Sequence, residues 1–203
     1  LANTNKLPTR NKQQELHHSY SYMTELLSNQ FTRNLTIQDF DECIILESKG
    51  FPPEQRCSPE NCQYRLSVAS KFCLGLFETT PLGDSKLIGH ILATKISTER
   101  ITEAGMGKKI EGVENSGHFE NSRNIGIHSV VIDPEYRGVH LGHIFLTKYI
   151  EYIRQFKLTD KILIINKESL IPFYLKVGFE NLGLTDCRFA GLIDYDMVYK
   201  LSS

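Results

Sequence analysis

One segment limits the possible folds of this chain more than any other, because a strand, a glycine-bearing turn and a helix follow one another without interruption. An apolar run over Gly126–Ile132 passes through Asp-Pro-Glu-Tyr into residues 137–142, and an amphipathic helix is expected from Leu141 to Phe156. The first backbone N–H groups of such a helix lack partners within it, and the helix dipole favours negative charge there. The segment therefore predicts an α/β domain with an anion site, suited to a pyrophosphate, at the start of this helix.

The rest of the chain divides into helix-like and strand-like segments. Residues 1–28 are polar and lack periodicity, so we expect a flexible N-terminal arm followed by one domain over residues 29–203. Helical spacing of apolar residues and suitable end residues predict further helices at Thr36–Gly50, Glu60–Ser67 and Leu170–Val177. Strand-like runs bounded by turn residues lie at Phe72–Glu78, Leu87–Ile96, Lys161–Asn166, Glu180–Leu184 and Tyr195–Leu201. This order predicts an α/β fold with a single central sheet.

Composition argues against several classes of function. The formal net charge is -1 with acids and bases interspersed, unlike the clustered Lys and Arg of a nucleic-acid binder. No apolar run is long enough to span a bilayer, and no charged start followed by an apolar stretch suggests a secretory signal. The 5 cysteines show no C-x-x-C spacing, which favours free thiols in a reducing compartment over disulfides or a zinc site. We expect a cytoplasmic protein without metal, nucleic-acid or membrane partners, and a monomer is favoured.

Two motifs resemble those of a known superfamily. Residues 136–142 resemble the acetyl-CoA pyrophosphate loop of GNAT enzymes, written R/Q-x-x-G-x-G/A, and residues 170–179 resemble their Y-x-x-x-G-F segment. The Pro-Phe-Tyr sequence at 172–174 is similar to that of arylalkylamine (serotonin) N-acetyltransferases and their fungal polyamine-acetylating relatives. The resemblance covers roughly residues 35–201. It implies the GNAT fold, a single mixed and mostly antiparallel sheet flanked by helices, with acetyl-CoA as co-substrate and a small primary amine as acceptor.

The resemblance also implies which residues bind the co-substrate. Strand backbone would hold the pantetheine arm and loop amides the pyrophosphate, giving the set Val130, Val131, Ile132, Arg137, Gly138, Val139, His140, Leu141, Gly142, His143, Asn166 and Phe173. Arg137 is also explained as a solvated surface cation. His140 stands at a position that is normally glycine, so its backbone must have either a negative φ or a left-handed conformation at some cost.

Amine acetylation requires a base to remove a proton from the amine and an acid for the departing thiolate. His128 suits the base, since its unperturbed pKa lies near 6.5, and strand alternation places it with Val130 and Ile132 on one face. The resemblance implies a pair of histidines, but Gly126 occupies the first position, so water or His118 would complete the proton path. Tyr174 is the predicted acid for the coenzyme A thiolate. Both side chains are alternatively explained as core residues.

The acceptor side is predicted from the same resemblance. Phe51, Pro52 and Pro59 are similar to the mobile substrate loop of these enzymes, or form a proline-stiffened connector, and Phe189 and Asp194 complete the predicted substrate-binding set. Asp194 occupies the place of an aromatic pocket residue, which favours a polyamine over an indole unless it is a turn residue. Two other functions stay open: a protein acetyltransferase, whose groove the insertion Thr98–Arg123 would build or block, and a non-catalytic acyl-CoA-binding module.

Overall fold

The computed structural model describes residues 25–138, 140–157 and 159–201. Most of the predicted arm, together with Val139, therefore lies outside the described residues. The boundary that we expect between arm and domain stays a prediction.

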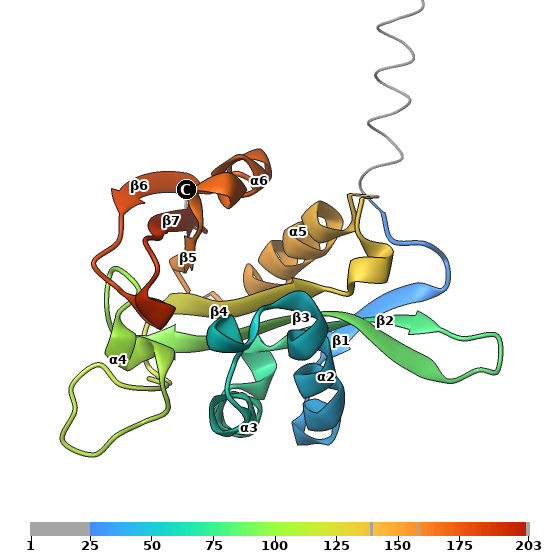
Figure 1. The fold of residues 1–203 in the computed structure, drawn as a ribbon, viewed down its shortest axis with the longest axis horizontal. Coiled ribbons are helices and arrows are strands. Elements are labelled where there is room, and N and C mark those ends of the chain that lie inside the picture. The colour runs from blue at the N-terminus through green and yellow to red at the C-terminus, as the bar shows by residue number, and fades with distance from the viewer. Residues whose placement is uncertain (1–24, 139, 158, 202–203) are drawn as a thin grey trace, which may run out of the picture.

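The described residues form a seven-stranded sheet in the order β1-β2-β3-β4-β5-β7-β6 (Figure 1). The strands are β1 Gln30–Asn34, β2 Leu74–Thr79, β3 Ser85–Ile96, β4 Asn124–Ile132, β5 Lys161–Asn166, β6 Glu180–Leu184 and β7 Tyr195–Lys200. Neighbouring strands pair antiparallel except β4 and β5, which are parallel. The predicted single sheet, mixed and mostly antiparallel, is confirmed.

Helices cover both faces of this sheet. They are α2 Phe40–Gly50, α3 Pro59–Val68, α4 Glu103–Met106, α5 Leu141–Ile153 and α6 Ile171–Val177. In Figure 1, α2 and α3 lie below the sheet and α5 and α6 above it. The predicted helices are confirmed to within a few residues, whereas β1 and α4 were not predicted.

The core consists of apolar side chains on the two faces of the sheet. On one face, α5 buries Phe145 and Tyr149 fully against the strands, and the Tyr149 hydroxyl donates a hydrogen bond of 3.0 Å to the Phe72 carbonyl. On the other face, α2 and α3 contribute Cys43, Leu46 and Leu66 to a second cluster. All five cysteines are free thiols.

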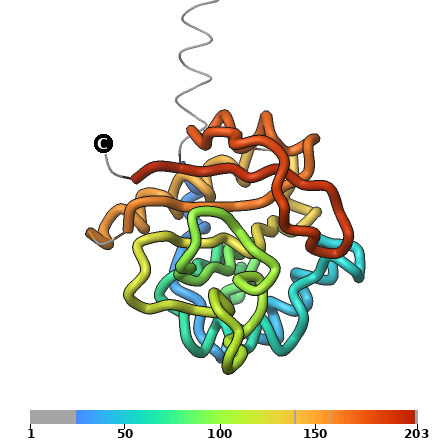
Figure 2. Tube along the Cα trace, turned by 90° about the vertical axis from the view of Figure 1, so that its left-hand side faces the viewer, coloured from blue at the N-terminus to red at the C-terminus, as the bar shows by residue number. Residues whose placement is uncertain are grey.

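Two loops distant in sequence meet at one end of the sheet. The turn Pro53–Gln55 after α2 contacts the turn Phe189–Gly191 before β7. Figure 2 shows this approach of the cyan and red parts of the chain. Loops that a rigid sheet holds in place are frequent sites of ligand binding, so this end of the molecule is a candidate location for a binding site.

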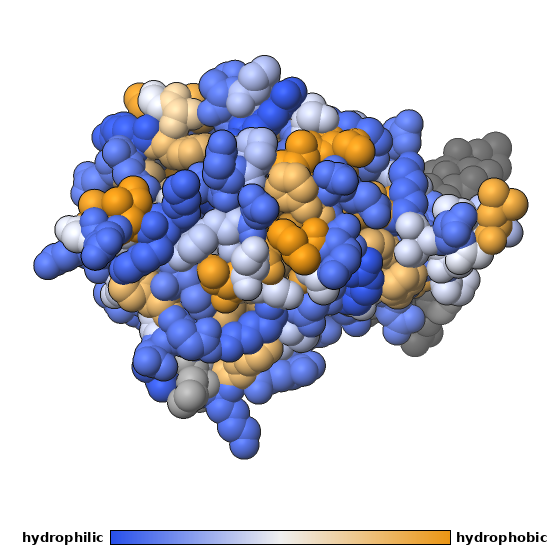
Figure 3. Space-filling view, turned by 90° about the horizontal axis from the view of Figure 1, so that it is seen from below, coloured by the Kyte–Doolittle hydropathy of each residue, from blue (hydrophilic) through white to orange (hydrophobic). Residues whose placement is uncertain are grey.

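The surface of the α2 and α3 face is mixed in character. Figure 3, which views the molecule from below, shows apolar side chains in separate small groups divided by polar ones. Scattered apolar residues of this kind are normal on a solvated surface. Among the residues described, no helix has both the length and the apolar character required to cross a bilayer.

Candidate active site

A pocket opens where two parallel strands separate. β4 pairs with β5 from Asn124 only as far as Ile127, opposite Ile164, although both strands continue further. A cavity of about 710 Å³ lies at this point, lined by the ends of both strands, the start of α5, α6, the Phe51 loop and the segment 189–194. Beyond Ile127 the edge of β4 that faces β5 has no strand partner among the described residues. This edge is where an extended ligand could pair with the strand. The contacts of Val130, Val131 and Ile132 with a pantetheine arm stay a prediction.

A β-bulge in β4 sets the direction of the candidate base. On β3, Leu92 pairs with Ser129 whereas the next residue, Ala93, pairs with Ile127, so His128 is the extra residue. The bulge interrupts the alternation of side chains. His128 and Ser129 both point to the α2 and α3 side, whereas Val130 and Ile132 pack toward α5. The prediction that His128 shares a face with Val130 and Ile132 is wrong for this reason.

His128 is half-buried on one wall of the pocket. Its Nε2 lies 2.7 Å from the Thr94 hydroxyl, and its Nδ1 lies 3.3 Å from the Met106 sulfur. A thioether has no proton to donate, so the tautomer with the proton on Nδ1 fits this setting and leaves the Nε2 lone pair to the Thr94 hydroxyl. Burial, together with the positive charge of Arg65, holds the pKa of His128 well below its ordinary value. The imidazole is therefore neutral at neutral pH, as a proton acceptor must be.

The other candidates for the proton path do not reach the pocket. The His118 ring accepts a hydrogen bond from the Lys95 backbone at Nδ1 and contacts Glu120 at Nε2, and it does not line the cavity. A Cβ placed on Gly126 would lie 2.9 Å from Ile101 and 3.0 Å from Ile96. Apolar side chains thus fill the place where the resemblance implies a first histidine.

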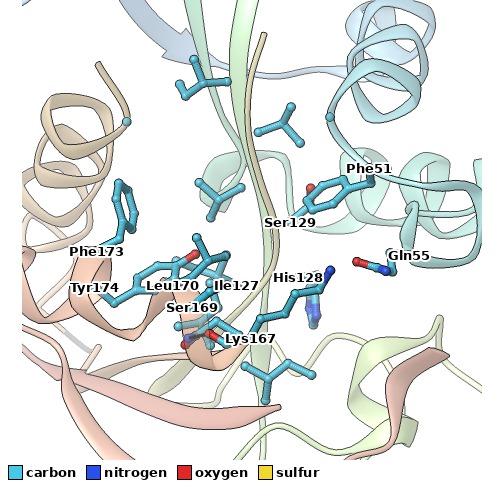
Figure 4. Close-up of a pocket in the computed structure, with 18 of the residues that line it drawn as sticks. Phe51, Gln55, Ile127, His128, Ser129, Lys167, Ser169, Leu170, Phe173 and Tyr174 are labelled. Carbon is cyan, nitrogen blue, oxygen red and sulfur yellow. Dashed lines mark hydrogen bonds between the residues drawn. The ribbon is translucent and has the colours of Figure 1, made fainter. Parts of the chain in front are cut away.

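Tyr174, the predicted acid, stands on the wall opposite His128. In Figure 4 it reaches in from α6 beside Phe173, with His128 on the far side of the strand. Its ring meets those of Phe173 and Phe179 edge to face, at centroid distances of 5.0 and 5.5 Å. Burial raises the pKa of Tyr174, so the phenol keeps its proton and is a hydrogen-bond donor at neutral pH.

The turn before α5 has the geometry of an anion site. Gly138 has φ +88° and His140 has φ +59°, both left-handed, and α5 starts at the next residue, Leu141. The left-handed alternative for His140 is therefore confirmed. Arg137 is exposed, and its Nε donates to the Ile132 carbonyl at 3.2 Å. Within the described residues its other guanidinium donors have no protein partner, which suits a phosphate.

Aromatic contacts link this turn to α6. The ring of His143 stacks on that of Phe173 with 4.3 Å between centroids, and a Cβ on Gly142 would lie 3.3 Å from the same ring. Burial lowers the pKa of His143. His143 and Phe173 line the cavity on the side between α5 and α6, and their contact with acetyl-CoA stays a prediction.

Replacing His140 with Gly tests the strain in this turn. We expect the free energy of unfolding to rise by about 0.5–1 kcal/mol, because relief of the left-handed conformation outweighs the added freedom of the unfolded chain. Urea denaturation measures it. Affinity for coenzyme A should not fall, since the turn binds anions through its amides. A lower unfolding free energy would show that the imidazole itself stabilises the turn.

The predicted acceptor residues are brought together with one exception. Phe51, Pro52, Phe189 and Asp194 all line the pocket. Pro59 does not, because it is the exposed first residue of α3, where its fixed φ suits the start of a helix. Its prediction as a pocket residue is wrong.

Asp194 and Asn166 place unsatisfied oxygens in this pocket. Each residue is 5% exposed, and each has an Oδ1 atom without a hydrogen-bond partner among the residues described. Burial raises the pKa of Asp194, and the charge of Lys167 opposes this shift. Buried polar atoms are costly when unpaired, so both oxygens are expected to receive donors from a ligand.

A buried polar cluster behind the pocket was missed by sequence reasoning. Glu47 of α2 accepts hydrogen bonds from the Ser129 hydroxyl, from His90 Nε2 at 2.9 Å and from the Cys57 backbone at 2.8 Å. Burial opposes ionisation of Glu47, but these bonds outweigh it and lower the pKa of the carboxyl. The cluster ties α2 to β3, β4 and the loop before α3. The one indication of this cluster in the sequence was Glu47, an acidic residue on the apolar face of the predicted helix Thr36–Gly50.

Solved structures share this fold, and a known enzyme is similar in sequence. The loading GNAT-like domain of CurA from Lyngbya majuscula superposes with TM-score 0.69 and 17% identity, over 85% of this chain and 98% of that one. The GphF GNAT-like decarboxylase in complex with isobutyryl-CoA superposes with TM-score 0.66 and 14% identity, over 85% of this chain and 100% of that one. Serotonin N-acetyltransferase from Mesocricetus auratus is 21% identical over 154 residues, 74% of this chain and 68% of the relative.

The structural neighbours establish the fold alone, and one of them is a decarboxylase, so they do not determine the reaction. The family model of the acetyltransferase (GNAT) domain matches residues 84–201, more than half of the chain. This match includes β3, the β4 bulge, the turn before α5 and Tyr174. The chain belongs to the GNAT acetyltransferase family, whose domain binds an acyl-coenzyme A.

Proposed function

We propose that this chain transfers an acetyl group from acetyl-CoA to a primary amine of a polyamine. The observation that supports this most strongly is the make-up of one pocket. A neutral His128 and a protonated Tyr174 line it on opposite walls. Asp194 lines it too, and its Oδ1 has no hydrogen-bond partner within the described residues. An acid, a base and a cation-binding group are what acetylation of a charged amine requires.

The pocket also fits an acyl-coenzyme A. The two left-handed residues Gly138 and His140 precede the free amides of α5, which suits the pyrophosphate. The separation of β4 from β5 leaves an unpaired strand edge for the pantetheine arm. When bound, acetyl-CoA supplies the thioester carbon that the amine attacks and the thiolate that leaves.

The residues of this chain account for the protons. A primary ammonium has three hydrogens on nitrogen and the product amide has one, so the nitrogen must lose two protons. His128 takes the first at Nε2, with the Thr94 hydroxyl turning aside or passing its own proton on, and releases it to solvent. The second is lost to solvent as the C–N bond forms. Tyr174 gives its proton to the sulfur as the C–S bond breaks, and its phenolate then takes a proton back from solvent, so one net proton is released per turnover. No covalent enzyme intermediate is needed.

Asp194 is proposed to bind the distal ammonium of the polyamine. We expect Asp194→Asn to lower kcat/KM for spermidine by about 10- to 100-fold, the value of a charged hydrogen bond, and that for tryptamine far less. Asp186→Asn is the matched control, because Asp186 also lies in the connection between β6 and β7 but is exposed and outside the pocket. Equal losses for both amines would remove the basis for a polyamine preference.

A competition assay tests the proposed function. Equimolar spermidine, tryptamine and a Lys peptide are mixed with acetyl-CoA and the wild-type chain, and the acetylated products are quantified by mass spectrometry. Acetyl-spermidine is expected to dominate. Dominance of the peptide product would favour a protein acetyltransferase. Absence of all products, despite measurable coenzyme A binding, would favour a binding module.

A further inference from the structure

A buried cation lies behind the candidate base. Arg65 of α3 is 3% exposed, and in the described part of the chain no carboxylate pairs with it. Its Nη2 donates a hydrogen bond of 2.6 Å to the Met106 carbonyl, and its Nη1 lies 3.0 Å from the Cys57 sulfur. Burying a charge without an opposite charge is costly. A neutral side chain of similar size would avoid this cost. Packing alone therefore does not account for a charged residue at this position.

Met106 connects this cation to the pocket. It ends the short helix α4, which begins with a Thr102 side chain accepting from the Gly105 amide. Its carbonyl is held by Arg65, and its sulfur lies 3.3 Å from His128 Nδ1. The segment that precedes β4 is thus fixed at one point, and that point contacts the imidazole.

We propose that Arg65 is a positioning residue for His128: it seats Met106 against Nδ1 and keeps the imidazole uncharged in a pocket that must admit a cationic amine. This inference rests on the proposed function, in which His128 accepts a proton. A protonated imidazole would repel the incoming ammonium and could not act as a base.

The surroundings of His128 support this assignment. Thr94 contacts the ring from β3 and Met106 contacts it from α4. Arg65 of α3 bonds the Met106 carbonyl, and Glu47 of α2 accepts from the neighbouring Ser129. Burial lowers the pKa of His128 and the charge of Arg65 lowers it further. The Glu47 carboxylate accepts hydrogen bonds from His90, Ser129 and the Cys57 backbone, and its bonds in the described part of the chain do not include one to His128.

The test measures the protonation of His128 directly by NMR titration of the imidazole signals, assigned by comparison with the His128→Gln variant. In the wild type, His128 is expected to titrate well below an ordinary histidine. Arg65→Lys keeps the charge and should keep the low pKa. Arg65→Gln retains a donor for the Met106 carbonyl but removes the charge, and should move the titration to higher pH.

Two results would overturn the inference. One is an ordinary His128 titration in the wild type, a result that does not depend on any variant being folded. The other is identical His128 titrations in Arg65→Lys and Arg65→Gln. Met106→Leu is the matched control, since it removes the sulfur but leaves the guanidinium, and should keep the pKa low. Thermal unfolding of each variant shows whether its fold is intact.

The pH dependence of kcat/KM links this titration to turnover. For Arg65→Gln we expect the acidic limb to move to higher pH, with about a tenfold loss at pH 6 and a smaller one at pH 8. A merely structural role would lower the whole profile without moving it. The two claims fail separately: a fully active His128→Gln would refute the proposed base, whereas an unmoved titration in Arg65→Gln would refute the role of Arg65.

Discussion

Replacement of His128 by Gln is expected to lower kcat for amine acetylation by about 10²- to 10⁴-fold, the usual contribution of a positioned general base. Glutamine keeps a polar partner for Thr94 Oγ1, so the bulge of β4 should persist and the loss should come from proton transfer. The measurement is the initial rate at saturating acetyl-CoA and amine.

His118→Gln provides the matched control for this experiment. That histidine was an alternative for the proton path, but its ring contacts Lys95 and Glu120 instead of the pocket. We expect its kcat to stay within about twofold of the wild type. The account would be contradicted if the His118 variant lost activity and the His128 variant kept it.

Replacement of Tyr174 by Phe is expected to lower kcat by about 10²-fold, because the thiolate would leave without a proton donor at its side. The change removes only the hydroxyl, so the edge-to-face contacts with Phe173 and Phe179 remain. The KM for acetyl-CoA should change little. Steady-state kinetics at several acetyl-CoA concentrations separate the two parameters.

Tyr199→Phe is the control for this second prediction. Tyr199 packs on Phe179 with 5.5 Å between ring centroids and is not among the residues that line the pocket. Its loss should leave kcat near the wild-type value. A Tyr174→Phe variant with wild-type kcat would show that solvent, rather than the phenol, protonates the thiolate.

Much of the fold could be predicted because its elements have clear periodicity. The strand Lys161–Asn166 was predicted to the residue from a short apolar run, and the helix from Leu141 from an apolar face with Phe145 and Tyr149 inside. β1 was missed because Gln30–Asn34 is mostly polar. Its one aromatic residue, Phe31, stacks on Phe77 of β2 at 5.6 Å, a contact that local sequence does not reveal.

The identities of the site residues were easier to predict from the sequence than the orientations of their side chains. His128 was found from its strand, but the bulge that turns it away from Val130 depends on pairing with β3, a partner distant in the sequence. The contributions of Arg65 and Glu47 depend on burial against other elements, which no local pattern reports. Pro59 was misplaced because proximity along a loop does not fix which residues face a cavity.

The most direct test of the whole account is release of the coenzyme A thiol from acetyl-CoA by the wild-type chain, with spermine, spermidine, putrescine, tryptamine, phenylethylamine or a Lys peptide as acceptor. The account predicts amine-dependent release that is fastest with the polyamines and negligible without an amine. Release with none of the small amines would contradict it.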